Sequence, residues 1–253
     1  MIKIKTALIS VFDKTGILDL AKNLAKNEVQ IISSGGTAKY LKENNIKVTE
    51  VSEYTGFNEI FDGRVKTLHP KIHAGILARG KSDENELKKI GARKIDLVVV
   101  NLYPFADEVA DEKSTEKSII EKIDIGGPAM IRAAAKNYKY TVVVTHPQQY
   151  QQLSLDEISE KESKELAADA FDLTCNYDSD VSNWFLNNSI GHTSIKLRYG
   201  ENPHQDGFLH VGEDPPIDFL NPLQGKEISY NNVSDSLAAW ACVQEFNEPS
   251  VCI

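Results

Sequence analysis

The sequence predicts an α/β protein built on a parallel β-sheet with helices on both faces. Two strand–turn–helix units follow each other between Ile4 and Asn44, and such units form parallel sheets with right-handed crossovers. A third observation is the run DLVVV at Asp96–Val100, because an unbroken apolar run is typical of a parallel strand covered on both faces. The 253 residues are enough for one large domain or two smaller ones.

The first part of the chain alternates regularly between strands and helices. The expected elements are strands at Ile4–Ser10, Val29–Ser33 and Val48–Val51 and helices at Ile17–Asn27 and Ala38–Asn44. Leu18, Ala21 and Leu24 give the first helix its apolar stripe. The turn SGGT at 34–37 follows the second strand directly and opens the second helix.

The later part has longer helices and ends in a segment of different character. We expect strands at Asp96–Val100 and Thr141–Thr145 and helices at Glu84–Ile90, Ser114–Ile123, Pro128–Asn137, Glu160–Asn187 and Ser234–Phe246. Pro128 suits the first position of its helix. Gly191 interrupts the pattern, so Ser189–Thr193 is a candidate linker. The apolar ending Pro249–Ile253 resembles the start of a strand, and we expect the natural chain to continue.

The segment Asp62–Lys81 reverses the charge of the chain locally. The net charge is -9, yet from Arg64 to Lys81 the segment has five basic residues and no acidic one. Its hydrophobic period fits neither a long helix nor a strand. Because loops carry function, we interpret it as a cationic loop that binds an anion. A solvated basic loop without function is the alternative.

Composition excludes several classes of protein. The pI of about 5.2 argues against nucleic-acid and membrane-surface binding, which need a broad positive surface. No stretch has the apolar length of a membrane span. Three cysteines without a CxxC pair exclude a disulfide framework and a thiolate zinc site and suit the cytoplasm.

Two polar loops are candidates for a phosphate site. Glycines and the free N–H groups of a helix N-terminus favour an anion at Ser34, Gly35, Gly36 and Thr37. An ordinary turn capped by Thr37 is the alternative. Ser10 and Lys14 follow the first strand, and ligands of parallel sheets bind outside the carboxyl ends of strands. We therefore expect both loops to lie side by side.

A second set of residues could move protons. Asn101, Tyr103, Asp124 and Lys136 combine an amide, a phenol, a carboxylate and an ammonium group. In the structural alternative, Asp124 caps the following helix and Lys136 decorates its end. His69 and His73 are four residues apart, but Pro70 stands where the HExxH motif has glutamate and no third ligand is recognisable. We expect no metal.

Six segments occur in the order found in one enzyme family. They are SVFDKTG, SSGGTAK, GRVKTLHPKIHAGIL, NLYPF, DIGGPAMIRAAAKN and LRYGENPHQ. The chain resembles the bifunctional purine-synthesis enzymes that join an IMP cyclohydrolase domain to an AICAR transformylase domain. The resemblance implies a methylglyoxal-synthase-like cyclohydrolase domain at 1–189. It also implies that 190–253 are a linker and the N-terminal part of the transformylase domain.

The resemblance implies a reaction and a set of site residues. The carboxamide nitrogen of formyl-AICAR attacks the formyl carbon, and loss of water gives IMP. The 5'-phosphate is expected at Ser10, Lys14, Ser34, Gly35, Gly36 and Thr37, the base and ribose at Arg64, Lys66 and Thr67, and the carboxamide at Asn101 and Tyr103. Lys66 is expected to stabilise the alkoxide, and Lys136, oriented by Asp124, to transfer the proton.

Further expectations concern the second domain and one departure from the family. Arg198 and Tyr199 match nucleotide-contacting positions of the transformylase domain. Phe12 stands where many relatives have a serine, whose phosphate contact a backbone N–H could replace. Cyclisation needs no cofactor, 10-formyltetrahydrofolate is the co-substrate of the full-length protein, and the family forms homodimers.

The sequence is compatible with two other functions. A methylglyoxal-synthase-like lyase would share the phosphate loop but would not need NLYPF, DIGG or the basic segment. A regulatory nucleotide-binding module would bind the purine nucleotide without converting it.

Overall fold

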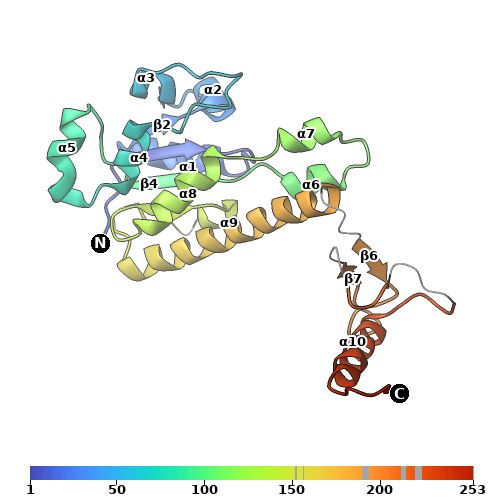
Figure 1. Ribbon diagram of the computed structural model, residues 1–253. Coiled ribbons are helices and arrows are strands. Elements are labelled where there is room, and N and C mark those ends of the chain that lie inside the picture. The colour runs from blue at the N-terminus through green and yellow to red at the C-terminus, as the bar shows by residue number, and fades with distance from the viewer. Residues whose placement is uncertain (152, 156, 190–193, 212–214, 220–223, 253) are drawn as a thin grey trace. The chain divides into compact units, whose positions relative to one another are not determined.

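The computed structural model describes residues 1–151, 153–155, 157–189, 194–211, 215–219 and 224–252 (Figure 1). The chain divides into two compact units, Met1–Asp180 and Val181–Ile253. The division falls inside the long helix α9, Glu160–Ser189. Most of the predicted linker, at 190–193, lies outside the described residues.

A five-stranded parallel sheet forms the centre of the first unit. Its strands are β1 (Thr6–Ser10), β2 (Gln30–Ser33), β3 (Thr49–Glu50), β4 (Leu97–Val100) and β5 (Val142–Val144). Their order is β3-β2-β1-β4-β5. The strand order therefore reverses direction at β1, which pairs with β2 on one side and β4 on the other. The prediction of a parallel α/β sheet is confirmed.

Helices cover both faces of this sheet. They are α1 (Ile17–Lys26), α2 (Gly35–Glu43), α3 (Val51–Thr55), α4 (Pro70–Leu77), α5 (Glu84–Lys89), α6 (Phe105–Ala110), α7 (Glu116–Ile120), α8 (Gly126–Lys136) and α9, with short 3-10 turns at Gly80–Asp83 and Pro147–Gln149. Figure 1 shows α8 and the long α9 running close to each other along the sheet.

Alternation along the strands divides the core in two. Ala7 and Ile9 of β1 face α1, which contributes Leu20 and Leu24 to that side. Leu8, between them, faces the opposite side. That second layer is built by α4, α8 and α9 through Ile72, Ile76, Met130, Ile131, Ala167 and Ala170. Both sheet faces are thus buried, which explains why the strands are apolar throughout.

Several helix boundaries differ from the sequence prediction. The helix α2 begins at Gly35 rather than Ala38, so the SGGT segment is the first turn of the helix. The helix α8 begins at Gly126, two residues before Pro128. The predicted helix over Ser114–Ile123 is reduced to Glu116–Ile120. The first turn of a helix is hard to recognise in a sequence when it consists of glycines, because glycine has poor helix propensity.

The basic segment Asp62–Lys81 is not a loop throughout. Its second half contains the helix α4, whose Ile72 and Ile76 are fully buried. His69 caps that helix, since its Nδ1 accepts a hydrogen bond from the Lys71 N–H at 3.1 Å. The sequence interpretation was wrong here because eight residues offer too few turns for a clear helical period.

The second unit combines a two-stranded sheet with one helix. Strands β6 (Ser194–Leu197) and β7 (Gly207–His210) pair antiparallel. The helix α10 (Tyr230–Gln244) begins at a capping box formed by Ser229 and Asn232. Leu197, Phe219 and Val233 form a small core.

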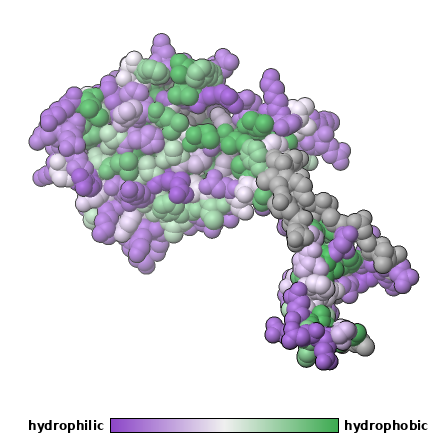
Figure 2. All heavy atoms as spheres, in the orientation of Figure 1, coloured by the Kyte–Doolittle hydropathy of each residue, from purple (hydrophilic) through white to green (hydrophobic). Residues whose placement is uncertain are grey.

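The surface of the described residues mixes hydrophilic and hydrophobic side chains (Figure 2). On the face seen in Figure 2, hydrophilic residues surround separate small hydrophobic groups, as on ordinary globular surfaces. In the described part of the chain, no helix combines the length and apolar character needed to cross a bilayer. Cys175, Cys242 and Cys252 are free and exposed.

Gly75 of α4 permits the close packing of that helix against the segment leading into β4. A Cβ atom at this position would lie 2.5 Å from the Arg93 carbonyl oxygen and 3.0 Å from the Ile95 side chain. We expect Gly75→Ala to lower the free energy of unfolding by about 1–3 kcal/mol through overpacking, measured by urea denaturation. Leu77→Ala, on the exposed side of α4, is the control and should cost less than about 1 kcal/mol. Equal stability of Gly75→Ala and the wild type would contradict this packing.

Candidate functional site

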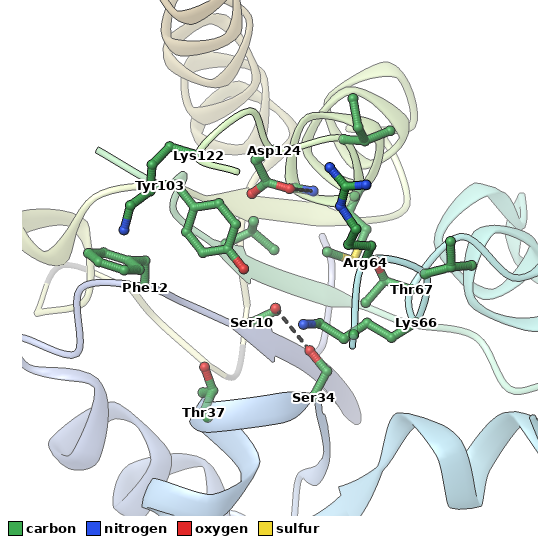
Figure 3. A pocket seen from close by; sticks show the side chains of 18 of the residues that line it. Ser10, Phe12, Ser34, Thr37, Arg64, Lys66, Thr67, Tyr103, Lys122 and Asp124 are labelled. Atoms are coloured by element: carbon green, nitrogen blue, oxygen red, sulfur yellow. Dashed lines mark hydrogen bonds between the residues drawn. The ribbon is translucent and has the colours of Figure 1, made fainter. Parts of the chain in front are cut away.

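A cavity of about 830 Å³ lies at the carboxyl ends of β1, β2 and β4. This is the position where parallel sheets bind ligands, next to the reversal of strand order. The structure brings most of the predicted site residues together here (Figure 3). Those that line the cavity are Ser10, Lys14, Ser34, Gly36, Thr37, Arg64, Lys66, Thr67, Asn101, Tyr103 and Asp124.

The loops after β1 and β2 touch each other, as predicted. The Oγ atoms of Ser10 and Ser34 are 3.1 Å apart and share a hydrogen bond. Ser34 is the N-cap of α2, so the N–H groups of the next three residues, Gly35 to Thr37, have no acceptor within the helix. Two hydroxyl groups beside a helix N-terminus form a suitable site for a phosphate group.

Thr37 does not play the predicted part. Its hydroxyl donates to the Val11 carbonyl at 2.8 Å and accepts from the Val11 N–H at 3.0 Å. The residue is only 3% exposed. Because the hydroxyl hydrogen is already used, the Thr37 side chain cannot donate to a phosphate. It instead joins α2 to the loop after β1, and only its backbone N–H remains for an anion.

Asn101 is likewise occupied by the loop after β1. Its Oδ1 accepts hydrogen bonds from the N–H groups of Phe12 and Asp13 at 2.6 and 3.2 Å, and its Nδ2 donates to the Asp13 carbonyl at 2.9 Å. Asn101 therefore shapes this loop from β4. The Phe12 N–H is engaged by Asn101 and is therefore not free to replace a serine hydroxyl.

Lys66 extends between two glycines with positive φ. A Cβ atom at Gly35 would lie 3.5 Å from its Nζ, and one at Gly63 would lie 3.6 Å away. The two φ angles are +51° and +85°, a region that disfavours other residues. Both positions thus leave room for the ammonium group, which points toward Ser10 and Ser34 in Figure 3.

Asp124 enters the cavity from the segment before α8. Its Oδ1 accepts a hydrogen bond from the Gly127 N–H at 2.8 Å, so it does cap the helix. Burial raises its pKa, while the Gly127 bond and the charge of Lys66 oppose this rise. Thr67 approaches so closely that a Cβ atom at Gly126 would lie 2.5 Å from its Oγ1. The start of α8 therefore lies directly against the segment that carries Lys66.

Tyr103 completes the inner part of the site. Its hydroxyl points into the space near Ser10 and Lys66 (Figure 3). Burial, with the charge of Asp124 as a smaller cause, raises the pKa of Tyr103. The phenol therefore stays protonated near neutral pH and is available as a hydrogen-bond donor.

The predicted pairing of Lys136 with Asp124 is wrong within the chain. Lys136 is the last residue of α8, and Asp124 precedes the first. The eleven residues of helix from Gly126 to Lys136 place the two ends about 15 Å apart. Lys136 is exposed and is not among the residues that line the cavity. The helix connects the two positions in sequence but separates them in space.

The remaining candidates lie at the rim or in the other unit. Arg64 forms an ion pair with Glu121 at 3.2 Å. Gly35 borders the site through its neighbour Lys66 rather than lining the cavity. Arg198 and Tyr199 belong to the second unit, where the guanidinium Nη2 lies 3.2 Å from the phenol oxygen. Their nucleotide contacts stay a prediction.

Sequence reasoning missed Lys122, which also lines the cavity. Its Nζ lies 5.1 Å from the centroid of the Phe12 ring, within the range of a cation–π contact. Phe12 packs edge-on against Tyr103 with ring centroids 5.5 Å apart. The only available signal was that Lys122 precedes Asp124 by two residues. Among the described residues, no group of three or more His, Cys, Asp or Glu side chains is placed to hold a metal ion.

Comparison with known proteins divides the chain between two family models. Residues 16–129 match the MGS-like domain, and residues 134–253 match the AICARFT/IMPCHase bienzyme. The chain is 49% identical to the "Bifunctional purine biosynthesis protein PurH" of Clostridium botulinum strains Langeland and Okra, over 98% of its own length and 53% of theirs. It thus spans about half the length of these curated relatives.

A solved structure gives an independent match. The "Crystal structure of ForH" superimposes with a TM-score of 0.64 and 30% sequence identity, over 72% of this chain and 100% of that one.

The role assigned to the Thr37 hydroxyl can be tested by stability. Thr37→Val keeps the shape but leaves the Val11 N–H and carbonyl groups without a partner. We expect the free energy of unfolding to fall by about 1–3 kcal/mol in urea denaturation. Thr37→Ser keeps the hydroxyl and should lose clearly less. A Val variant as stable as the Ser variant would show that the two hydrogen bonds do not hold the loop.

Proposed function

The chain belongs to the AICARFT/IMPCHase bienzyme family, and we propose that its first unit closes formyl-AICAR to IMP with loss of water. The observation that carries this proposal is a single cavity that joins a phosphate-type site to Lys66, Tyr103 and Asp124. A nucleotide has the matching arrangement, with an anionic phosphate at one end and a reacting base at the other.

The phosphate end holds the substrate. The hydroxyls of Ser10 and Ser34 and the free N–H groups of Gly36 and Thr37 face a 5'-phosphate, and Lys14 adds charge from the loop after β1. The Lys14 Nζ lies 3.2 Å from the Phe12 carbonyl, which keeps it at this loop. Because ring closure is intramolecular, holding the carboxamide near the formyl carbon removes much of the entropic barrier.

At the reacting end, Lys66 stabilises negative charge. Attack of the carboxamide nitrogen on the formyl carbon moves electrons to the formyl oxygen. The ammonium group of Lys66, already in place between Gly35 and Gly63, faces this developing alkoxide. A preorganised charge in a partly enclosed site lowers the barrier more than the same charge in water.

Asp124 acts as the base in this reaction, and Tyr103 acts as a hydrogen-bond donor. The nitrogen loses a proton as it bonds to carbon, and the ionised Asp124 carboxylate accepts it. A raised pKa makes this carboxylate a stronger base than an exposed one. The former formyl oxygen takes up two protons and leaves as water, with Tyr103 hydrogen-bonded to it. Asp124 passes on the proton that it took from the carboxamide nitrogen, and the formamide nitrogen loses the second proton as its double bond to the formyl carbon forms. Lys136 has no part in this scheme, because it lies at the far end of α8.

The whole relatives are longer than this chain, and their second activity extends the proposal. We propose that the full-length protein also transfers a formyl group from 10-formyltetrahydrofolate to AICAR, with Arg198 and Tyr199 contacting the nucleotide. Cyclisation itself requires no cofactor in this scheme. A domain division at 1–189 and 190–253, a cytoplasmic location and a homodimer are further parts of the proposal.

The direct test is turnover by the 253-residue chain. Ultraviolet absorbance should show conversion of formyl-AICAR to IMP, and dihydroxyacetone phosphate should be left unchanged. IMP binding without conversion would favour a regulatory module instead. Release of methylglyoxal from dihydroxyacetone phosphate would favour a lyase.

Lys66→Ala tests the charge at the reacting end. We expect IMP to bind with little change and kcat to fall by about 10²–10³, the usual cost of a lost electrostatic donor. An absorbance assay of IMP formation gives kcat, and calorimetric titration gives the affinity for IMP. Lys81→Ala, an exposed lysine of the same segment, is the charge-matched control. Turnover by Lys66→Ala at the wild-type rate would remove Lys66 from the mechanism.

The pH dependence of kcat tests Asp124 as the base. Since the carboxylate must be ionised, kcat should fall as pH drops through the raised pKa of Asp124, so the acid limb should lie above the ordinary carboxyl value of 3.8. The Lys66 charge lowers this pKa. The acid limb of the residual activity of Lys66→Ala should therefore move to higher pH. A limb that stays in place or moves to lower pH would contradict this coupling.

A further inference from the structure

The long helix α9 contacts the segment that carries Asp124 through the side chain of Tyr177. Its hydroxyl donates to the Lys122 carbonyl at 2.8 Å and accepts from the Asp124 N–H at 2.7 Å. One oxygen thus bridges two main-chain groups that lie two residues apart, on both sides of Ile123. A phenol hydroxyl has one hydrogen to give, and here that hydrogen is used on the segment that carries Asp124.

The surroundings keep this hydroxyl in place and protonated. Tyr177 is only 8% exposed, and its ring packs edge-on against Phe105 with centroids 6.1 Å apart. Burial raises the pKa of Tyr177 to about 12, so the O–H remains a donor across the neutral range. Phe105 starts the helix that follows β4, which ties the phenol to the same sheet edge as the cavity.

Asp124 is consequently held at two points. Tyr177 fixes its main-chain N–H, and the Gly127 N–H fixes its carboxylate. The first contact fixes the main-chain position of Asp124, and the second fixes the direction in which its carboxylate points. Small displacements matter at such a place, because misplacing a reacting group by about 1 Å can cost 10² in rate.

We propose that Tyr177 is a positioning residue for the reaction, which sets the location of the Asp124 carboxylate by bridging Lys122 and Asp124. The proposal rests on the proposed function, in which Asp124 accepts the proton. Tyr177 lies in the part of the chain matched by the bienzyme model, beyond the 16–129 matched by the MGS-like model. The long helix α9 thus adds a control over Asp124 that the MGS-like segment alone does not supply.

The chain offers a matched control. Tyr150 is also 8% exposed, but its hydroxyl has no hydrogen-bond partner among the residues that the structure describes. Tyr150→Phe and Tyr177→Phe therefore remove the same atom from similarly buried rings. Only the second change removes contacts to the Asp124 segment.

The kinetic test compares these two variants with the wild type on formyl-AICAR. We expect Tyr177→Phe to lower kcat about tenfold, within the range that misplacement costs, while KM and the affinity for IMP change less than about twofold. We expect the affinity to be retained because the phosphate site is built by the loops after β1 and β2, not by the segment that carries Asp124. Tyr150→Phe should turn over like the wild type. Equal kcat values for both variants, or a loss that matches a smaller folded fraction in circular dichroism, would overturn the proposal.

A second readout does not depend on turnover. Hydrogen exchange followed by NMR should show the Asp124 amide exchanging at least about tenfold faster in Tyr177→Phe, because its acceptor is gone. In Tyr150→Phe the rate should be unchanged. Absence of wild-type turnover would reject the proposed function, whereas an unchanged Asp124 exchange rate in Tyr177→Phe would reject the bridge itself.

Discussion

The pairing of β1 with β2 on one side and β4 on the other is the constraint on which the site depends. Parallel pairing brings three carboxyl ends to one edge, and the reversal of strand order opens a crevice there. The contact between Ser10 and Ser34 is a direct result. Asn101, which follows β4, then shapes the neighbouring loop. Much of the polar chemistry at this edge serves the geometry of the loops rather than the ligand.

In the proposed reaction, the cavity has two tasks, to hold the phosphate group and to promote ring closure. Hydroxyls and free N–H groups at the start of α2 provide a neutral cradle that suits an anion. Lys66, Tyr103 and Asp124 line the same cavity and bring one positive, one neutral and one negative group together. Their proximity depends on glycines, since Gly35 and Gly63 leave space for the Lys66 ammonium and Gly126 lets Thr67 approach α8. These three glycines thus determine which side chains can approach one another in the cavity.

The sequence predicted the sheet well because its buried strands are apolar runs of ordinary length, as in Leu97–Val100. Most of the site residues that it predicted also line the cavity, many of them in the loops that follow those strands. The sequence could not show that the Thr37 and Asn101 side chains are hydrogen-bonded to backbone groups, since such contacts join segments distant in sequence. Lys136 was misplaced because a helix start and its end were treated as neighbours. Tyr177 lies within the predicted helix Glu160–Asn187, but a hydroxyl group that bonds to a distant segment gives no periodic signal.

The most direct test of the account is a crystal structure of the chain with IMP bound. We expect the 5'-phosphate within hydrogen-bond distance of Ser10, Ser34 or the Gly36 N–H group, and the purine beside Lys66 and Asp124. A phosphate bound instead at Arg64 and Lys66 with the base near Ser34, or IMP bound only in the second unit, would contradict it.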